Sequence, residues 1–221
     1  MPEVNSLDVS FPLKCGDFYC EPLSKSKEHK AIVKTFQSSH EKGKNLAAYL
    51  KDRALEDIES GVARTFLVFE EPGYLCGFFT LKAGLFPLEA RGKLFYTLPG
   101  IDLVYFAKNG AYLNSTKVDI GARMFFDFIL PIVKLARLYI GASHLYIYAI
   151  HSSNLQRTYE LKYGFAYPPK EVKNFIESHI KPEYDEDCDF MFIRLSGTEN
   201  KKMPPQKKRQ REKFDKLLNS C

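Results

Sequence analysis

Apolar residues along the chain are grouped in short runs, most of which have the length of a β-strand. Residues 64–84 contain two such runs on either side of Pro72 and Gly73, which predicts a β-hairpin. Further strands are predicted at residues 8–14, 101–107, 144–150, 165–168 and 188–195.

Helical spacing of apolar residues predicts helices between these strands. Two are expected at residues 28–38 and 46–60, the second with Asn45 as its N-cap and Gly61 at its end. A short helix begins near Ser153, where Gln156 completes a capping-box pattern, and Gly164 suits the position after its last turn.

A longer helix is predicted at residues 122–140, which are apolar except for a narrow stripe of charged residues. Such a helix is expected to lie against a sheet. Pro131 has no backbone N–H and should bend the helix near Asp127, whose carbonyl would otherwise accept that hydrogen bond.

In chain order the predicted elements read β-α-α-β-β-β-α-β-α-β-β, which indicates an α/β fold of the α+β kind. The strand at residues 101–107, the long helix and the strand at 144–150 form a crossover unit. The chemistry of such a unit is expected where the first strand ends and the helix begins. Free backbone N–H groups at a helix start suit a pyrophosphate.

The net charge of +5 is concentrated at one end of the chain. Residues 197–221 contain eight Lys or Arg and three Asp or Glu, which leaves 24 basic and 24 acidic residues in residues 1–196. We therefore predict a domain at residues 1–196 and a basic C-terminal tail at 197–221, which is flexible or forms a short helix. The tail is a candidate contact for nucleic acid.

Composition predicts a globular protein in the cytoplasm. The five cysteines are scattered without a CxxC pair, which favours reduced thiols over a disulfide scaffold or a zinc site, and the five histidines show no ligand spacing, so no metal is expected. The first ten residues have no apolar core, which predicts no secretory signal, and charges interrupt the most apolar segment, which predicts no membrane span.

Four segments, taken in order, resemble the GNAT superfamily of acyl-CoA-dependent N-acetyltransferases. They are "IDLVYFAKN", "KVDIGAR", "YIYAI" and "NLQRTYELKYGF", the last resembling a motif of the form N(x)nYExxGF. The resemblance covers about residues 60–195 in element order. It implies a mixed, mostly antiparallel twisted sheet flanked by helices, with acetyl-CoA as co-substrate and no metal.

The resemblance also implies which residues bind the cofactor. The backbone near Phe106, Ala107 and Lys108 would hydrogen-bond the pantetheine arm, and Asn154 stands at a family position near the cofactor, although an Asn at a helix start is also a common cap. The amides that would surround the pyrophosphate belong to Val118, Asp119, Ile120, Gly121, Ala122 and Arg123.

The pyrophosphate loop departs from the family pattern. The family has Gln or Arg, two residues, Gly, any residue, then Gly or Ala, whereas this chain has Thr116 in the first place and Asp119 where the first Gly belongs. A carboxylate there would repel phosphate unless it caps the helix, so we expect Asp119 to be the N-cap, with Lys117 and Arg123 offsetting its charge.

Tyr159 and Asp102 are the candidate catalytic residues. Tyr159 resembles the family tyrosine that protonates the departing CoA thiolate, although a tyrosine on a helix also fits core packing. Asp102 lies in an apolar strand and is the candidate base for the amine, unless it points to solvent or to a buried Arg; a water relay is the alternative, and His151 is a weaker candidate.

The acceptor is expected to be a primary amine that attacks acetyl-CoA directly in a ternary complex. A looser resemblance to toxins that acetylate aminoacyl-tRNA makes that RNA an alternative acceptor, and a CoA- or RNA-binding module without turnover is a non-enzymatic alternative. The acidic run at residues 183–189 could attract a cation or be a solvated loop. The insertion at 85–100, with Phe86, Phe95 and Tyr96, could cover the acceptor or only pack. A homodimer is among the expected assemblies.

Overall fold

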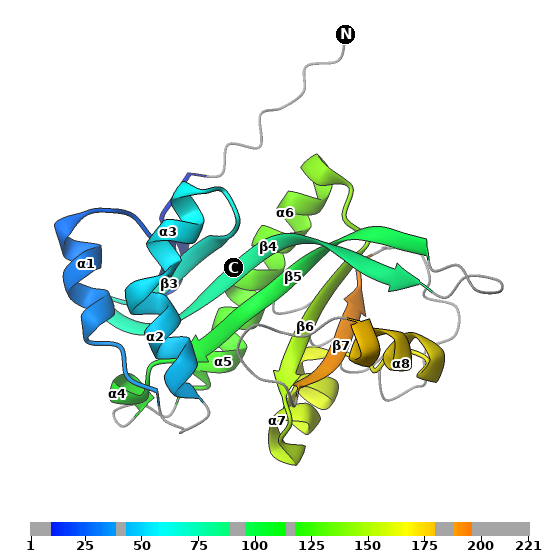
Figure 1. The fold of residues 1–221 in the computed structure, drawn as a ribbon. Helices are drawn as coiled ribbons and strands as arrows, with labels where there is room; N and C mark the ends of the chain where they lie inside the picture. Colours follow the sequence, from blue (N-terminus) through cyan, green and yellow to red (C-terminus); the bar gives the residue numbers. More distant parts are fainter. Residues whose placement is uncertain (1–9, 39–42, 89–95, 114–117, 180–187, 196–221) are drawn as a thin grey trace, which may run out of the picture.

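The computed structural model describes residues 10–38, 43–88, 96–113, 118–179 and 188–195 (Figure 1). These residues contain one seven-stranded sheet in the order β1-β2-β3-β4-β5-β6-β7. Only β5 and β6 pair in parallel; every other neighbouring pair is antiparallel. The strands are β1 (Leu13–Cys15), β2 (Phe18–Pro22), β3 (Arg64–Glu70), β4 (Tyr74–Leu88), β5 (Tyr96–Lys108), β6 (His144–Ile150) and β7 (Cys188–Arg194).

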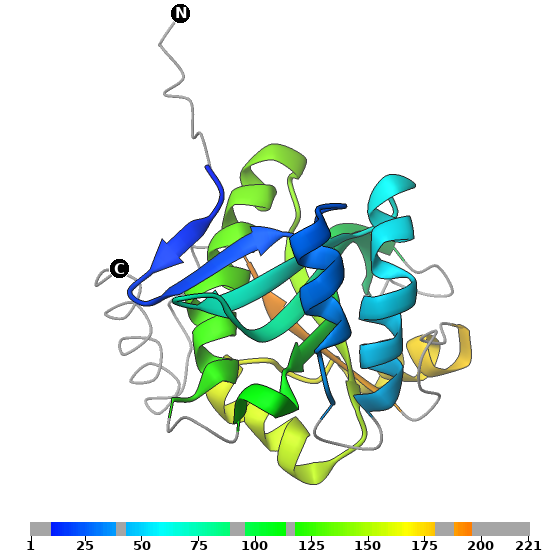
Figure 2. The same cartoon turned by 90° about the vertical axis from the view of Figure 1, so that its left-hand side faces the viewer.

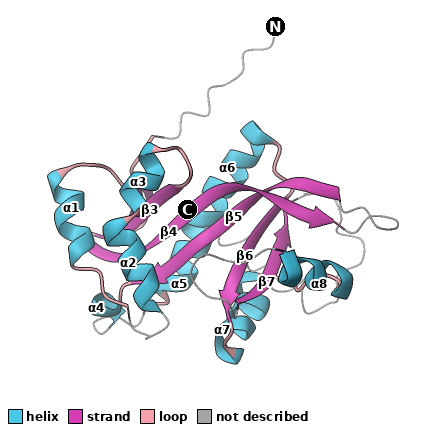
Figure 3. Cartoon of the chain, viewed as in Figure 1, coloured by secondary structure: helices cyan, strands magenta, loops and turns pink. Residues whose placement is uncertain are grey.

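Helices cover both faces of this sheet (Figures 2 and 3). One face carries α1 (Lys27–Lys34), α2 (Lys44–Asp52), α3 (Ala54–Glu59) and α8 (Lys170–His179). The other carries α5 (Ile120–Arg123), the π-helical segment η2 (Met124–Ile129), α6 (Leu130–Ile140), α7 (Ser153–Thr158) and the π-helical segment η3 (Tyr159–Tyr163). A short helix α4 (Gly110–Leu113) follows β5. The predicted mixed, mostly antiparallel sheet flanked by helices is therefore confirmed.

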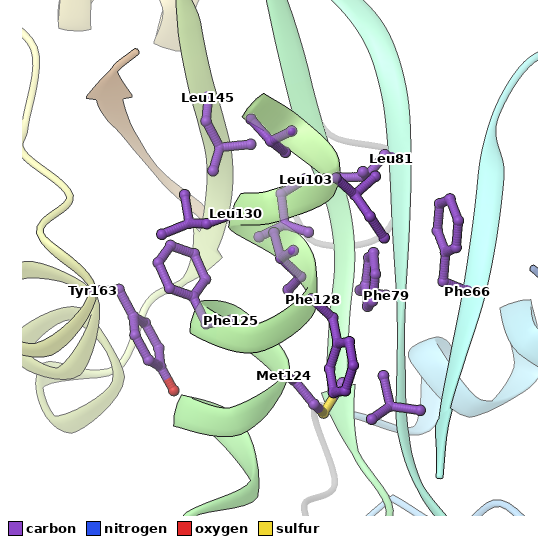
Figure 4. Close-up of a cluster of buried hydrophobic side chains, with 14 of the residues drawn as sticks. Phe66, Phe79, Leu81, Leu103, Met124, Phe125, Phe128, Leu130, Leu145 and Tyr163 are labelled. Atoms are coloured by element: carbon purple, nitrogen blue, oxygen red, sulfur yellow. The ribbon is translucent and has the colours of Figure 1, made fainter. Parts of the chain in front are cut away.

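The largest hydrophobic cluster lies between the sheet and the continuous helix formed by α5, η2 and α6 (Figure 4). Phe125, Phe128 and Val133 of this helix are fully buried. Phe79 of β4 and Leu103 of β5 are their fully buried counterparts in the sheet. Burying each such side chain stabilises the fold by about 1.5–3 kcal/mol, so this contact fixes where the helix begins relative to β5.

Proline is responsible for the irregularity in the long helix, as the sequence predicts. Pro131 has no N–H to donate, and the chain just before it adopts π-helical geometry instead of a regular turn. The N–H of Leu130 bonds the carbonyl of Phe125, five residues earlier. The predicted charged stripe also forms: Arg123 donates to Asp127 at 3.0 Å.

Several predicted elements near the amino terminus were wrong in detail. The expected strand at 8–14 is a hairpin of β1 and β2, of which the structure describes residues from 10 onward. The helix expected at 46–60 is divided into α2 and α3 at Arg53. Asn45 lies inside α2, and the N-cap position is taken by Gly43 without a side-chain hydrogen bond.

The predicted strand at residues 165–168 was also wrong. Only one bridge forms there, between Ala166 and Phe192, because Pro168 and Pro169 cannot donate to a sheet. The next residues form α8, which the sequence pattern did not predict. Its Val172 and Ile176 are four residues apart and pack in a small cluster with Tyr146.

The predicted tail at residues 197–221 lies outside the described residues, so the domain division stays a prediction. No helix in the described segments is both long and apolar enough to cross a bilayer. Cys20 and Cys76 are free and buried, as expected for reduced thiols, whereas Cys15 is disulfide-bonded, contrary to that expectation. The linear spacing of cysteines does not show which sulfur atoms meet in space.

A Gly77→Ala substitution tests the contact between the sheet and the helix start. A Cβ on Gly77 would lie 2.5 Å from the backbone oxygen of Ala107 and 2.6 Å from the sulfur of Met124. Because the backbone at Ala107 cannot move without shifting the end of β5, we expect a loss of about 1–3 kcal/mol in unfolding free energy, measured by urea denaturation. An unchanged denaturation midpoint would contradict this packing.

Candidate active site

The parallel strands β5 and β6 pair over three residues only and then separate. The pairing runs from Gly100 with His144 to Asp102 with Tyr146, although β5 continues to Lys108 and β6 to Ile150. Figure 1 shows the two strands diverging toward their carboxyl ends. The divergence leaves one edge of β5 without a paired strand among the described residues.

A β-bulge precedes the open edge. The register with β4 shifts so that Leu103 pairs with Leu81 while Tyr105 pairs with Thr80, which leaves Val104 as the extra residue. Bulges bend a strand and often occur beside active sites. This feature was missed in the sequence, because the bulge leaves no turn residue or charge in the apolar run.

The three residues expected to contact the pantetheine arm lie at the end of β5. Their pairing partners Gly77, Phe78 and Phe79 are all on β4, so the opposite edge of Phe106, Ala107 and Lys108 faces the divergence. The Phe106 ring packs against Tyr159 and Tyr163, with centroid distances of 6.5 and 5.8 Å. The open edge can therefore accept an extended chain as an added strand.

Asp119 is the N-cap of the long helix, as predicted. Its Oδ1 accepts a hydrogen bond from the N–H of Ala122 at 3.1 Å. Of its neighbours in the expected pyrophosphate loop, Val118 is exposed and Ile120 is buried in the core. Thr116 and Lys117 lie outside the described residues.

Of the two cations expected to offset Asp119, Lys117 lies outside the described residues and Arg123 does not pair with Asp119. Arg123 pairs instead with Asp127 and lies over the ring of Phe18, 5.6 Å from its centroid. The Nζ of Lys162, in η3, forms an ion pair with Oδ2 of Asp119. The sequence analysis missed Lys162 because it is 43 positions from Asp119 and only the fold joins them.

Gly121 is required by the close approach of Tyr163. The Tyr163 hydroxyl lies 2.5 Å from the position that a Cβ on Gly121 would take, and Figure 4 shows this ring beside Phe125. Lys108 also reaches this point, its Cδ 3.6 Å from the same position. Residues from β5, the helix start and η3 therefore converge around Gly121.

Tyr159 is buried at the first residue of η3, where it packs against Phe165 at a centroid distance of 5.5 Å. Burial raises its pKa far above the usual range, so the phenol keeps its proton. Gly164 ends the segment with φ of 80°, as predicted. The tyrosine is thus both core packing and a protonated group at the cluster that faces β5.

The expected capping box at this helix is wrong. Ser152 is the N-cap and makes no side-chain hydrogen bond. Gln156 donates instead to the buried carboxylate of Asp189, which also bonds Nδ1 of His151 at 2.8 Å. These contacts engage His151 and Asp189 with each other rather than with the opening between β5 and β6.

Asn154 is exposed in the first turn of α7, with its backbone carbonyl accepting a hydrogen bond from Thr158 at 2.8 Å. It lies inside the helix and is not the N-cap, so capping does not explain it.

Asp102 lies at the last paired position before β5 and β6 diverge. Its Oδ1 is buried and has no hydrogen-bond partner in the described part of the chain. Burial raises the pKa of this carboxyl to about 7, and the positive charge of Lys82 on β4 opposes the rise only in part. The alternative of a buried Arg partner is excluded within the described residues.

Asp102 and Tyr159 lie on opposite faces of the sheet. Asp102 shares its face with Lys82 and Tyr146, its cross-strand partners on β4 and β6, and Tyr146 packs with α8. Tyr159 packs with the long helix on the other face.

The insertion expected at residues 85–100 is largely an extension of β4 and β5. Phe86 is buried and stacks on His144 at a centroid distance of 4.0 Å, so it packs in the core and is not a lid. Phe95 lies outside the described residues, as does most of the acidic run at 183–189.

A surface cavity of about 450 Å³ lies elsewhere, between β2 and α1. Its His29 accepts a hydrogen bond from the N–H of Ser24 and contacts Glu21 at 2.8 Å. These contacts engage both ring nitrogens in local structure. Among the described residues, no group of three or more His, Cys, Asp or Glu side chains is placed to hold a metal ion.

Comparison of the coordinates with solved structures identifies the fold as the GNAT N-acetyltransferase fold that the sequence resemblance implied. The fold is shared in particular with the proteins AtaT and KacT. No protein-family model matches the sequence, and neither does any curated protein.

Three solved structures illustrate the match. AtaTR bound with AcCoA has 17% identity and a TM-score of 0.59, over 81% of this chain and 95% of that one. The KacTA–DNA complex has 14% identity and a TM-score of 0.58, over 92% and 99%. AtaT complexed with acetyl-methionyl-tRNAfMet has 16% identity and a TM-score of 0.54, over 80% and 95%.

The raised pKa of Asp102 predicts how stability depends on pH. Between about pH 4 and 7 the folded state binds a proton that the unfolded state has lost, so stability falls as pH rises through this window. Asp102→Asn should remove this loss and make the protein more stable than wild type at pH 8, by on the order of a few kcal/mol.

The measurement is the unfolding free energy of both proteins at pH 4.5 and pH 8. Asp52→Asn, on an exposed position of α2, is the control and should leave the difference between the two pH values unchanged. If the unfolding free energy changes between the two pH values by the same amount in wild type and in Asp102→Asn, then Asp102 is not buried as described.

Proposed function

We propose that this protein is an acetyltransferase that moves an acetyl group from acetyl-CoA to a primary amine in a ternary complex. The observation that carries the proposal is the divergence of β5 and β6 after Asp102, with a protonated phenol on one face and a buried carboxylate on the other. The solved structure of AtaTR bound with AcCoA has the same fold, which supports this cofactor.

The cofactor site consists of backbone groups on two elements. The open edge of β5 at Phe106, Ala107 and Lys108 would pair with the pantetheine arm. The pyrophosphate would lie at the loop of residues 118–123, in which the amides of Ile120, Ala122 and Arg123 already donate to Val118 and Asp119, with Asn154 near the cofactor. Gly121 is buried, and the space that a Cβ would take there is filled by the Tyr163 hydroxyl, with Lys108 beside it.

Asp102 is proposed as the base. A pKa of about 7 leaves a large fraction of the carboxylate ionised at neutral pH and gives it a useful affinity for a proton. As the amine nitrogen bonds to the acetyl carbon, Asp102 accepts the proton that the nitrogen loses, directly or through one water.

Tyr159 is proposed as the acid. The carbon–sulfur bond breaks as the carbon–nitrogen bond forms, and the phenol donates its proton to the departing thiolate. Burial keeps the phenol protonated until a strongly basic group appears beside it. Free CoA and an N-acetyl product leave, and the two residues regain their starting protonation through solvent.

The acceptor that we favour is aminoacyl-tRNA, which was the first alternative from the sequence. AtaT, with the same fold, has been captured with acetyl-methionyl-tRNAfMet. The basic tail at residues 197–221 would add contacts to phosphate groups. The general class is a primary amine, which a small molecule or a protein could also carry.

Tyr159→Phe tests the acid. Because the substitution keeps the ring and its packing, we expect turnover of acetyl-CoA to fall about a hundredfold or more while the melting temperature stays within a few degrees. Tyr167→Phe, at a partly exposed position in the following loop, is the matched control and should keep wild-type turnover. Equal rates for Tyr159→Phe and wild type would remove Tyr159 from the mechanism.

A second assay tests the acceptor. With labelled acetyl-CoA and aminoacyl-tRNA, we expect acetylation whose KM rises steeply with salt, because phosphate contacts release counterions. Deletion of residues 201–221 should raise KM and weaken its salt dependence. Binding of CoA without turnover on tRNA or on an amine panel would favour the non-enzymatic module instead.

A further inference from the structure

Two departures from the family pattern lie next to each other in the structure. The first is Asp119, which stands where the pyrophosphate loop has glycine. The second lies in "YELKYGF", where four residues separate Tyr159 from Gly164, whereas the motif YExxGF has three. The two positions are far apart in the sequence, and their side chains are in contact.

The extra residue is accommodated by η3. A π-helical turn holds one more residue than an α-helical turn, so the segment from Tyr159 to Tyr163 still ends at a left-handed Gly164. In this turn Tyr163 points its hydroxyl at Gly121, and the adjacent Lys162 reaches Asp119. Two consecutive side chains of η3 therefore contact the start of the long helix.

Both oxygens of Asp119 are engaged there. Oδ1 accepts from the N–H of Ala122 at 3.1 Å, and Oδ2 faces the ammonium group of Lys162. The side chains of Asp119 and Lys162 are 55% and 34% exposed, so solvent screens the pair and its own contribution to stability is small. Stability alone gives little reason for this arrangement.

Positive charge exceeds negative charge at this point. The Cδ of Lys108, at the end of β5, lies 3.6 Å from the Cβ position of Gly121, and Lys162 pairs with Asp119 beside it, so two lysines and one carboxylate approach the start of the long helix. Burial lowers the pKa of Lys162, and the positive charge of Lys108 lowers it further, so the two ammonium groups repel each other. A bound anion would relieve this repulsion.

We propose that Lys162, assisted by Lys108, binds the diphosphate of acetyl-CoA and neutralises Asp119, so that the longer tyrosine motif compensates for the missing glycine of the loop. In this arrangement Lys162 lies between the diphosphate and the carboxylate of Asp119, so Asp119 can remain the helix cap. This inference rests on the proposed function and assigns side-chain contacts where the family resemblance implied only backbone amides.

The test measures dissociation constants of two ligands for the full-length protein by calorimetry. Acetyl-CoA carries the diphosphate, and S-acetylpantetheine lacks it. We expect Lys162→Gln to weaken acetyl-CoA about tenfold or more and to change S-acetylpantetheine less than twofold. Lys170→Gln, at an exposed position in α8, is the control and should bind both ligands as wild type does.

Asp119→Asn tests whether Lys162 neutralises Asp119 or only attracts the phosphate groups. Asparagine caps a helix about as well as aspartate, so the fold is retained. In the Lys162→Gln background it should restore most of the lost affinity, because the remaining repulsion is removed. In the wild-type background it should change the affinity less than threefold.

The outcomes are distinct. If wild type binds neither ligand, the proposed function fails together with this inference. If wild type binds acetyl-CoA and Lys162→Gln does so equally well, or loses both ligands equally, only the phosphate role of Lys162 is overturned. If the double variant binds no better than Lys162→Gln, Lys162 contacts phosphate without neutralising Asp119, and the compensation is wrong.

Discussion

The short parallel pairing between β5 and β6 is the constraint on which the rest of the molecule depends. A sheet that paired along its whole length would bury the edge of β5, and no backbone group there could meet a ligand. The long helix packs its fully buried Phe125 and Phe128 in one cluster with Leu103 of β5 and Leu145 of β6, so it covers the face of the sheet where these two strands are paired.

The sequence predicts the order of the central elements because their patterns are strong. The hairpin around Gly73, the long apolar helix and its irregularity before Pro131 all follow from local rules. The strand expected at residues 165–168 and the missed α8 show the limit. The first fails because Pro168 and Pro169 cannot donate to a sheet, and the second depends on packing with Tyr146, which is 26 positions before Val172 in the sequence.

The candidate site likewise contains residues that the sequence predicts and residues that it does not. Asp119 as a cap could be predicted, since it depends on its immediate neighbours in the chain. Asp102 could be selected as a carboxylate in an apolar strand, although its burial depends on the elements packed around it. Lys162 could not, because its partner comes from a distant segment, and the β-bulge at Val104 leaves no mark in an apolar strand. Gly121 was predicted as a close approach to pyrophosphate, and the structure adds the hydroxyl of Tyr163 beside it.

The π-helical turn of η3 also affects how this chain should be aligned with others. Counting back from Gly164 without a gap places Glu160 where the motif YExxGF has its tyrosine, and Tyr159 falls one position outside it. The turn lets the segment gain one residue while Gly164 and Phe165 keep their places. Related chains are best superimposed here in space first, with the gap then set inside the turn.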